Sequence, residues 1–274
     1  MNKQTRNLER QVDKLLGAGG RAVTLKHLMA LDKLRKELAT AYEKYADEDG
    51  KLTQEEMVKY DRLKKLDKTI ESVVKDLYKD TSAEIRASLR GVARTAADGT
   101  ISLLEQQTGR KVRGIAKDLD VDKLINTEMA GLKWTERMNK SRADTIWNIQ
   151  REIKAGLSQG DTYATMAKRL KKEIDISAGK AMQIVRTEGH RVKSQAVVES
   201  LESVAKRIKM TKTWHSSRDE RTRESHLRMH GMTVPFEEDF ILPDGTRTEA
   251  PGLTGVPEHD INCRCIMTVD IVRE

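Results

Sequence analysis

The sequence predicts a mainly α-helical protein in which an elongated helical N-terminal region is followed by a small α+β module. Charged residues make up 34% of the 274 residues and hydrophobic residues only 37%, a balance that favours long, exposed helices over one compact globule. No proline precedes Pro235, so only glycines and capping residues can end a helix in most of the chain. All four prolines, both phenylalanines and both cysteines follow residue 234, which marks the last quarter as a different kind of structure.

Residues 1–155 are expected to form a helical leader, because apolar residues recur there at helical spacing. The Gly17–Gly20 stretch is expected to separate the first two helices. Thr53 and Glu56 have the spacing of a capping box, which predicts that a third helix begins there and pairs with the second in antiparallel orientation. The expected helices cover residues 3–16, 21–45, 53–78, 81–97, 100–119 and 120–156.

The turn before Thr53 has an alternative interpretation as a calcium-binding loop. Asp47, Asp49 and Glu56 fall on positions 3, 5 and 12 of an EF-hand loop. Position 1 would then be Tyr45, which supplies no carboxylate, and a capped turn explains the same residues without a metal.

Residues 156–206 are expected to form a basic helical segment, with a short helix over 161–174 and a longer one over 177–204. The net charge of the chain is +8, and such an excess attracts polyanions, nucleic acid foremost. Two interpretations of the basic side chains stay open: a solvated helix face, or a surface that contacts DNA phosphates without reading sequence. The candidate nucleic-acid-binding residues are Lys168, Arg169, Lys171, Lys172, Arg191 and Lys193.

Residues 207–274 are expected to form the α+β module. The alternation over 208–214 predicts a strand, and residues 219–230 predict a short helix. A hairpin is expected around the Pro-Asp-Gly sequence that ends at Gly245, and the alternation over 263–271 predicts a last strand.

An ordered set of motif residues links this module to a known family. The set contains Trp214, Asp219 with Arg223, His226, Gly231 and the Asn-Cys-Arg-Cys sequence of residues 262–265, and it is preceded by an Arg-Thr-Glu sequence at 186–188. Through these residues, positions 156–265 resemble the C-terminal region of the phage minor head, or head morphogenesis, family, which includes proteins like the minor head protein F of phage Mu. The leader shares only a general helical character with that family.

The resemblance implies a structural virion protein that is not an enzyme. It implies a minor capsid protein, made in the host cytoplasm and placed inside the capsid at the portal vertex, that acts in prohead assembly, DNA packaging and genome ejection. The implied partners are the portal protein, other capsid and scaffold proteins, viral double-stranded DNA and further copies of the chain. A membrane span is not expected, because no stretch approaches the roughly 18 apolar residues that a span needs.

The module also contains a candidate site for a structural zinc ion. Cys263 and Cys265 would point the same way from one strand, and His226 and His259 could complete four ligands. A small module with few core residues would gain stability from a metal. The Cys-x-Cys spacing is shorter than that of usual structural zinc sites, so two small buried thiols beside satisfied histidines are the alternative.

The remaining motif residues are expected to fix the shape of the module, through a charged network in which Arg221, Arg223 and Arg264 pair with Asp219, Asp260 or Glu188. Asp219 is expected to cap the helix that contains His226, and Trp214 to anchor the core with its indole N–H donating to a carbonyl group. The expected structural residues are Arg186, Glu188, Trp214, Asp219, Arg223, His226, Asn262 and Arg264. Two other functions stay open as alternatives: a zinc-dependent nuclease or hydrolase that uses His226 and Asp219, and a plain helical DNA-binding protein.

Overall fold

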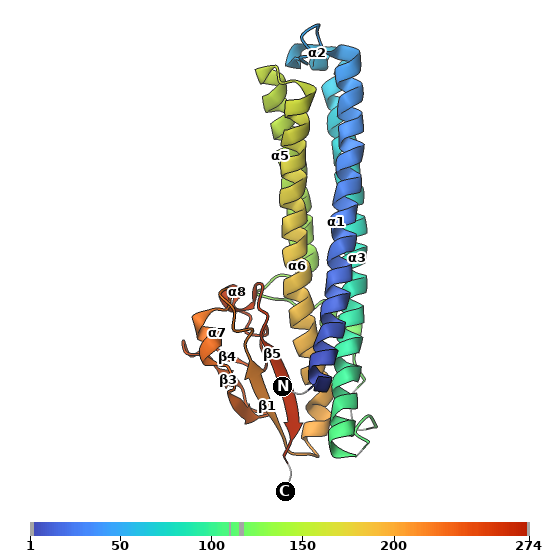
Figure 1. The fold of residues 1–274 in the computed structure, drawn as a ribbon. Helices are drawn as coiled ribbons and strands as arrows, with labels where there is room; N and C mark the ends of the chain where they lie inside the picture. Colours follow the sequence, from blue (N-terminus) through green and yellow to red (C-terminus); the bar gives the residue numbers. More distant parts are fainter. Residues whose placement is uncertain (1–2, 110, 115–117, 273–274) are drawn as a thin grey trace. The chain divides into compact units, whose positions relative to one another are not determined.

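The computed structural model describes residues 3–109, 111–114 and 118–272. It confirms a mainly α-helical protein with long helices and a small C-terminal module that contains all the strands of the described residues (Figure 1). The elements are α1 (Lys3–Tyr45), α2 (Gln54–Val58), the 3₁₀ helix η1 (Lys59–Asp61), α3 (Arg62–Thr108), α4 (Val121–Ile125), α5 (Trp134–Gln159), α6 (Tyr163–Ala205), β1 (Met210–His215), α7 (Glu224–Arg228), β2 (Thr233–Pro235), β3 (Phe240–Ile241), β4 (Arg247–Thr248), α8 (Pro257–Asp260) and β5 (Ile266–Ile271).

The long helices have fewer interruptions than the sequence predicted. α1 continues through the glycine-rich stretch at 17–20, where a helix end was expected, and α3 and α6 likewise continue through expected breaks. A Cβ atom on Gly19 would lie 2.6 Å from Oγ of Ser88, and one on Gly20 would lie 2.7 Å from Cε of Met182. These glycines therefore allow neighbouring helices to pack closely. The packing outweighs the roughly 0.5–1 kcal/mol of stability that glycine costs in a helix relative to alanine.

Other expected helix boundaries also differ. The stretch 120–156 forms two helices, α4 and α5, because the chain turns at Ala130 and Gly131, both with positive φ. The helix expected over 100–119 ends at Thr108 as part of α3, and residues 110 and 115–117 lie outside the described residues.

The turn before α2 is a capped turn. Oγ1 of Thr53 accepts a hydrogen bond from the backbone N–H of Glu56 at 3.3 Å, as predicted. Oδ1 of Asp47 accepts one from the backbone N–H of Lys51 at 2.8 Å. The side chains of Asp47 and Thr53 thus accept hydrogen bonds from nearby backbone N–H groups. This arrangement favours a capped turn over a calcium-binding EF-hand loop.

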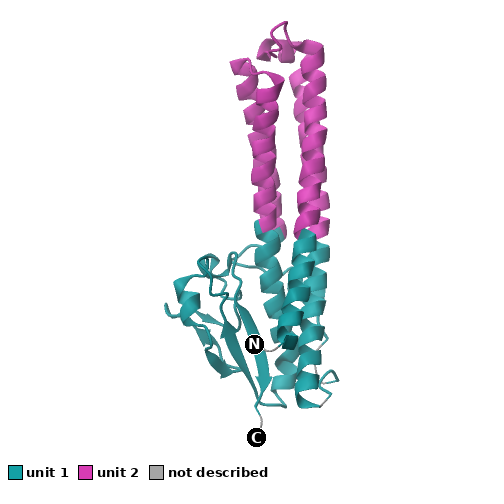
Figure 2. Ribbon diagram, viewed as in Figure 1, with its two compact units in different colours: residues 1–19, 86–134, 183–274 teal, residues 20–85, 135–182 magenta. Residues whose placement is uncertain are grey.

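Contacts between residues divide the chain into two compact units, and each unit combines separate stretches of the sequence (Figure 2). Unit 2 contains residues 20–85 and 135–182, and unit 1 contains the residues up to 19, 86–134 and those from 183 on. The three consecutive domains expected at 1–155, 156–206 and 207–274 stay a prediction. α1, α3 and α6 each contribute to both units.

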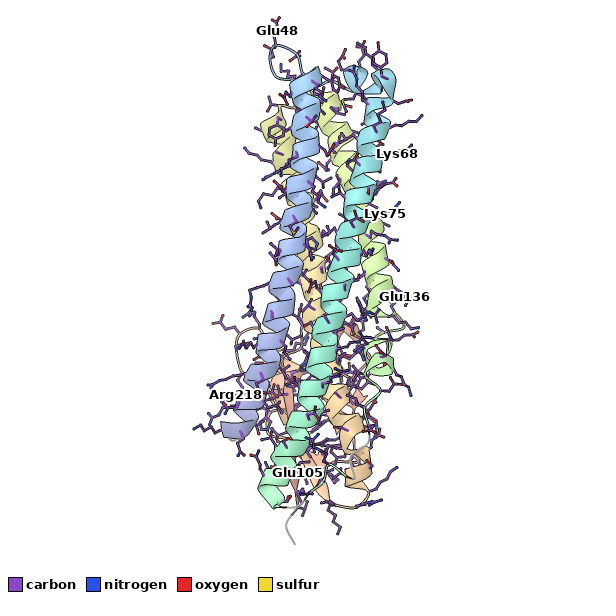
Figure 3. All side chains as sticks on the ribbon, turned by 90° about the vertical axis from the view of Figure 1, so that its right-hand side faces the viewer. Glu48, Lys68, Lys75, Glu105, Glu136 and Arg218 are labelled. Atoms are coloured by element: carbon purple, nitrogen blue, oxygen red, sulfur yellow. The ribbon has the colours of Figure 1, made fainter. Side chains whose placement is uncertain are left out.

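Unit 2 is built from segments of four long helices. The salt bridge between Nζ of Lys26 and Oδ2 of Asp80, at 3.4 Å, and the guanidinium of Arg62 over the Tyr45 ring, at 3.7 Å, confirm that α1 and α3 are antiparallel. Exposed charged side chains line the outer face, among them Lys68 and Lys75 on α3 (Figure 3). None of the described helices has an apolar stretch long enough to cross a membrane.

Inside unit 2 lies a buried set of hydrogen-bonding side chains, which we call the polar layer. The hydroxyl of Tyr78 lies 2.9 Å from each of three side-chain oxygens, on Ser141, Thr145 and Ser177. Nε2 of His27 lies 3.1 Å from Oγ of Ser177, and its Nδ1 lies 2.8 Å from the carbonyl oxygen of Val23. Every polar group of the layer has a partner, so it fixes how the four helices align without leaving an unsatisfied group.

Residues 207–272, which we call the terminal module, form part of unit 1. β1 lies between β2 and β5 in an antiparallel sheet, and β3 pairs with β4 in a separate hairpin. The hairpin turn is the predicted one: Gly245 has φ +87° and its N–H donates to the carbonyl oxygen of Leu242 at 2.9 Å. The core of the module consists of Trp214, Met229, Phe240, Leu242, Cys263 and Cys265.

Candidate functional site

Three side chains of the types that ligate metals converge in the core of the terminal module. His226 lies on α7, and Cys263 and Cys265 lie in the segment between α8 and β5. Nδ1 of His226 lies 3.7 Å from Sγ of Cys263 and 3.4 Å from Sγ of Cys265. All three ligand atoms lie within 4.8 Å of one another, and all three residues are buried. The thiols precede β5, so the expected placement of both in the last strand is wrong, but their convergence is confirmed.

The geometry fits a tetrahedral metal. Bonds of about 2.3 Å to sulfur and 2.0–2.1 Å to nitrogen at tetrahedral angles require roughly 3.6 Å between a nitrogen and a sulfur ligand. The two observed nitrogen–sulfur distances, 3.4 and 3.7 Å, lie on either side of that value. These three side chains can therefore hold a zinc ion with little rearrangement.

The two thiols are electrostatically unequal. The pKa of Cys265 is lowered, chiefly by its hydrogen bond with Cys263. The pKa of Cys263 is raised, first by the same hydrogen bond and then by burial. The hydrogen bond between the two thiols thus favours the thiolate form at Cys265 over Cys263, and the thiolate is the form that binds metals.

Aromatic rings enclose this group. The Trp214 ring meets the His226 ring edge to face, with centroids 5.4 Å apart, and meets Phe240 in the same way at 5.4 Å. Trp214 is fully buried, which confirms it as the anchor of the core. Its Nε1 has no carbonyl partner, contrary to the expectation; the indole instead lies beside Cys265 and helps to lower the pKa of that thiol.

His259, the fourth ligand expected from the sequence, is engaged elsewhere. Its Nε2 lies 2.7 Å from Oδ2 of Asp244, and its ring stacks on that of His226 with centroids 5.5 Å apart. The pKa of Asp244 is lowered to about 2, mainly by the backbone N–H of Thr246 and then by His259. His259 is absent from the compact group of ligand atoms.

A third histidine, which the sequence analysis did not select, acts on one of the thiols. His190 of α6 is only 7% exposed, and it works to lower the pKa of Cys263. The signal available in the sequence was its position two residues after the Arg-Thr-Glu motif at 186–188. Among the described residues, one buried ring nitrogen in each of His190, His226 and His259 lacks a hydrogen-bond partner.

Three motif residues fix the loops around this site. Asp219 and Arg264 form a bidentate ion pair, with Nη2 of Arg264 2.5 Å from Oδ1 of Asp219. Nη2 of Arg223 donates to the carbonyl oxygen of Ile261 at 2.6 Å. The pKa of Asp219 is strongly lowered, first by Arg264 and then by the hydroxyl of Thr222. The expected network of charged motif residues thus exists, although this pair lies at the surface.

Some expected roles of motif residues are wrong. Asp219 caps no helix, because α7 begins only at Glu224; its carboxylate closes the preceding turn instead, accepting from Oγ1 of Thr222 at 3.0 Å. Glu188 forms a buried ion pair with Arg191, three residues further along α6, at 2.7 Å. Arg186 is exposed and has no hydrogen bond or ion pair within the described part of the chain.

Asn262 connects the terminal module to α6. It adopts a left-handed conformation with φ +55°, which asparagine tolerates better than most residues. Its backbone N–H donates to Oγ1 of Thr187 at 3.2 Å, and Oγ of Ser194 donates to the carbonyl oxygen of Pro251 at 2.7 Å. The Asn-Cys-Arg-Cys segment is therefore held directly against α6.

The structure separates the six candidate DNA-binding residues into two groups. Arg191 and Lys193 are buried in unit 1, where Arg191 pairs with Glu188 and Lys193 pairs with Glu9. They therefore present no charge to a phosphate backbone, and the prediction that they bind DNA is wrong. Arg169 is half-buried and bound to Asp161, Glu152 and Gln159. Lys168, Lys171 and Lys172 are exposed on α6 in unit 2, with Lys171 next to Asp175.

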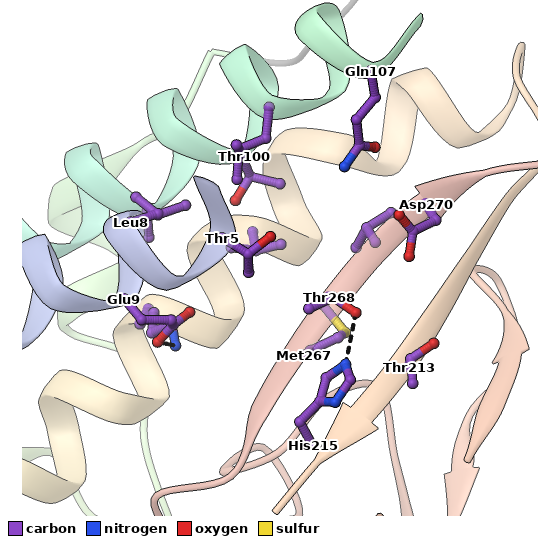
Figure 4. Close-up of a pocket in the computed structure, with 15 residues that line it drawn as sticks. Thr5, Leu8, Glu9, Thr100, Gln107, Thr213, His215, Met267, Thr268 and Asp270 are labelled. Carbon is purple, nitrogen blue, oxygen red and sulfur yellow. Dashed lines mark hydrogen bonds and ion pairs between the residues drawn. The ribbon is translucent and has the colours of Figure 1, made fainter. Parts of the chain in front are cut away.

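Unit 1 also contains a pocket of about 310 Å³ that the sequence did not predict (Figure 4). α1, α3 and α6 line one side of it, and β1 and β5 line the other. Nε2 of His215 lies 2.9 Å from Oγ1 of Thr268 at its wall, and burial lowers the pKa of His215. The Glu9–Lys193 ion pair lies at the helical wall.

Comparison with known proteins connects these motif residues to a family. Residues 147–268 match the family described as Phage Mu protein F like protein, a range that contains the whole site. The chain is also 28% identical over 261 residues to the minor head protein GP7 of Bacillus phage SPP1, which covers 95% of this chain and 84% of that protein. The chain is similar to phage minor head proteins. The resemblance predicted from the sequence is thereby confirmed, and it extends beyond the terminal module into the helical leader.

Two bacterial proteins share part of the chain. It is 31% identical over 150 residues to the NAD(+)--arginine ADP-ribosyltransferase EFV of Enterococcus faecalis, and 24% identical over 178 residues to an uncharacterized protein of Haemophilus influenzae. These matches span 30% and 36% of the two relatives, so most of each bacterial protein has no counterpart here. No solved structure matches the chain.

Proposed function

We propose that this protein is a minor component of a phage head that enters the prohead at the portal vertex and acts in DNA packaging and ejection. The observation that carries the proposal is the match to a minor head protein over 95% of the chain, because it includes the helices of both units as well as the terminal module. The partners are the portal protein, other capsid and scaffold proteins, and further copies of the chain. The location is the interior of the virion.

The role is structural and involves no enzymatic turnover. In support, the charged motif residues bind one another and the backbone: Asp219 binds Arg264, and Arg223 binds the carbonyl oxygen of Ile261. Such pairs fix the shape of loops. The ADP-ribosyltransferase activity named for the Enterococcus protein is not transferred to this chain, which covers only 30% of that protein.

Contact with double-stranded DNA is assigned to α6 in unit 2. Lys168 and Lys172 are exposed, lie four residues apart on one helix face, and form no ion pair within the described residues. Free ammonium groups of this kind bind phosphates by releasing counterions, without reading sequence. The net charge of +8 acts in the same direction.

The terminal module binds a structural zinc ion through His226, Cys263 and Cys265. The supporting observation is the pair of nitrogen–sulfur distances, 3.4 and 3.7 Å, that a tetrahedral ion requires. A buried ion of this kind adds folding free energy to a module whose core is small.

The test of the proposed function uses phage-infected cells in which this chain carries a small affinity tag. Proheads purified on a density gradient should contain the tagged chain, and the portal protein should be recovered with it after the heads are disrupted. A chain that stays in the low-density fractions, without portal protein, contradicts the proposal.

A further inference from the structure

The outer face of α1 in unit 2 carries a cluster of exposed apolar side chains. Leu25 is 56% exposed, Leu28 54% and Met29 50%. Within the described residues, α3 exposes no large apolar side chain, and α5 and α6 expose one each, Trp147 and Ile176. Single exposed apolar residues are normal on a protein surface, whereas a contiguous group of them marks an interaction site.

This cluster is separate from the stripe of α1 that faces the core of the bundle. Val23, Ala30 and Leu34 are buried and lie on one side of the helix. At 3.6 residues per turn, Leu25 and Leu28 point to the opposite side. A surface helix needs one apolar stripe to pack on its own core. The second stripe therefore has no role in the fold of a single chain.

Two charged residues extend the cluster along the helix axis. Arg21, Leu25, Leu28 and Asp32 follow one another at intervals of four, three and four residues, which is the spacing of a coiled-coil seam. We call these four residues the α1 seam. Both charged residues are exposed; Asp32 pairs with Lys36 of its own helix at 2.8 Å, and Arg21 has no ion pair within the described part of the chain. The seam thus has a basic end, an apolar middle and an acidic end.

A seam of this kind is complementary to a second copy of itself in antiparallel orientation. If Leu25 lies opposite Leu28 of the second copy, Arg21 lies opposite Asp32 of that copy, because both pairs are centred between residues 26 and 27. Each contact then occurs twice, as in any interface around a twofold axis. A parallel alignment would instead place Arg21 against Arg21 and Asp32 against Asp32, and like charges in contact disfavour association.

We propose that two copies of the chain associate through the α1 seam, antiparallel around a twofold axis. The inference rests on the proposed function, which includes further copies of the chain among the partners, and it assigns their contact to a surface. From Arg21 to Asp32 the seam is about 16 Å long at 1.5 Å per residue. This is short for a stable complex, which buries roughly 1,200–2,000 Å². The association is therefore weak and favoured by high local concentration.

Sedimentation equilibrium of the purified full-length protein, at concentrations rising to its solubility limit, measures the association. The weight-average mass should rise toward twice that of one chain. A variant with both Leu25→Gln and Leu28→Gln should have an association constant at least about tenfold lower, because its seam buries less apolar surface. Ile176→Gln is the matched control, since it removes an exposed apolar side chain of α6 in the same unit. A parent that stays monomeric, or an equal loss in the control, would overturn the inference.

A charge exchange tests the pairing of Arg21 with Asp32. Arg21→Glu alone and Asp32→Arg alone should each weaken the association about fivefold or more, since two contacts between opposite charges become contacts between like charges. The double variant restores both contacts with the signs exchanged, and it should associate within about twofold of the parent. A double variant as weak as the single ones would show that these residues do not face each other.

Disulfide cross-linking tests the orientation of the two copies. The natural cysteines, Cys263 and Cys265, are buried. In an equal mixture of Leu25→Cys and Leu28→Cys, the mixed disulfide should form faster than either symmetric one, because a disulfide needs Cβ atoms only about 3.5–4.5 Å apart. Mass spectrometry of the linked peptides distinguishes the three products. Faster formation of the symmetric Leu25→Cys product would contradict the antiparallel arrangement.

Failure of this inference can be told apart from failure of the proposed function. A chain that is monomeric in these assays but is recovered in purified proheads overturns the contact through α1 and leaves the proposed function standing. A chain that associates through the α1 seam but is absent from proheads supports the contact and overturns the proposed function.

Discussion

Unit 2 and the terminal module bury their side chains in different ways. In unit 2, apolar residues spaced along four helical segments share the burial, and one polar layer around Tyr78 sets the alignment. In the terminal module, a core of six residues is concentrated around Trp214 and the two thiols. A distributed core tolerates the loss of one member, whereas a small core depends on each residue. The two regions should therefore respond very differently to single substitutions.

The largest effect is expected from the tryptophan of the terminal module. Trp214→Ala should lower the free energy of unfolding by about 3–5 kcal/mol, because it removes a fully buried ring from a small core. Trp147→Ala is the matched control in unit 2, since that ring is 60% exposed and lies under the guanidinium of Arg151, a contact worth about 0.5–1 kcal/mol. Urea denaturation followed by circular dichroism measures the unfolding free energy of both variants. Equal losses in the two would contradict the predicted difference between the terminal module and unit 2.

The next effect tests the polar layer of unit 2. Tyr78→Phe removes the hydroxyl that three side-chain oxygens share, and it should cost about 1–3 kcal/mol because those groups are buried. Tyr60→Phe is the control, since Tyr60 is 80% exposed. A Tyr78→Phe variant as stable as its control would show that the layer does not help to hold the helices together.

A smaller effect concerns DNA. Replacing Lys168 and Lys172 together by glutamine should weaken binding to double-stranded DNA of any sequence, and the slope of log affinity against log salt should become shallower by roughly 0.9 for each phosphate that the variant no longer neutralises. The control is the double replacement of Lys68 and Lys79 by glutamine, which removes the same charge from exposed positions on α3. Gel shifts at rising salt concentration measure the DNA affinity of both double variants. If binding weakens equally in the two, the loss of net charge alone explains the effect, and Lys168 and Lys172 have no special role.

The smallest effect is a pH dependence in unit 2. Burial lowers the pKa of His27 below its ordinary value of 6.5, beside the Tyr78 ring and Ser177. The unfolded chain therefore binds a proton at this residue at a higher pH than the folded one. Stability should be complete above pH 6.5 and should fall as the pH drops from there to the folded-state pKa.

His27→Gln supplies the comparison for that dependence. The drop in unfolding free energy between pH 7.5 and pH 5.5 should be smaller in this variant than in the parent. An unchanged drop would mean that other groups cause it, His215 of unit 1 among them, since burial lowers its pKa too.

The sequence predicted the terminal module better than the helices. Alternation over 208–214 and the Pro-Asp-Gly turn gave β1 and the β3–β4 hairpin, because these signals are local. The breaks expected inside α1, α3 and α6 were wrong, since glycines such as Gly19 serve contacts with residues such as Ser88, far away in the sequence. Only the folded chain shows whether a glycine ends a helix or lets another helix approach.

The candidate site shows the same limit. The convergence of His226, Cys263 and Cys265 was predictable from their chemistry and from their position in one small module. The influence of His190 on the pKa of Cys263 was not predictable, because it depends on how α6 lies against that module. The burial of Arg191 and Lys193 was missed for a related reason: long basic side chains are usually exposed, and their acidic partners Glu188 and Glu9 had to be located in space.

The most direct test of the account is the composition of purified phage heads. Quantitative mass spectrometry should find the full-length chain at low copy number in both proheads and mature heads, and the unstable Trp214→Ala variant should be depleted from them relative to Trp147→Ala. Heads that assemble, package DNA and infect normally without any copy of this chain would contradict the account.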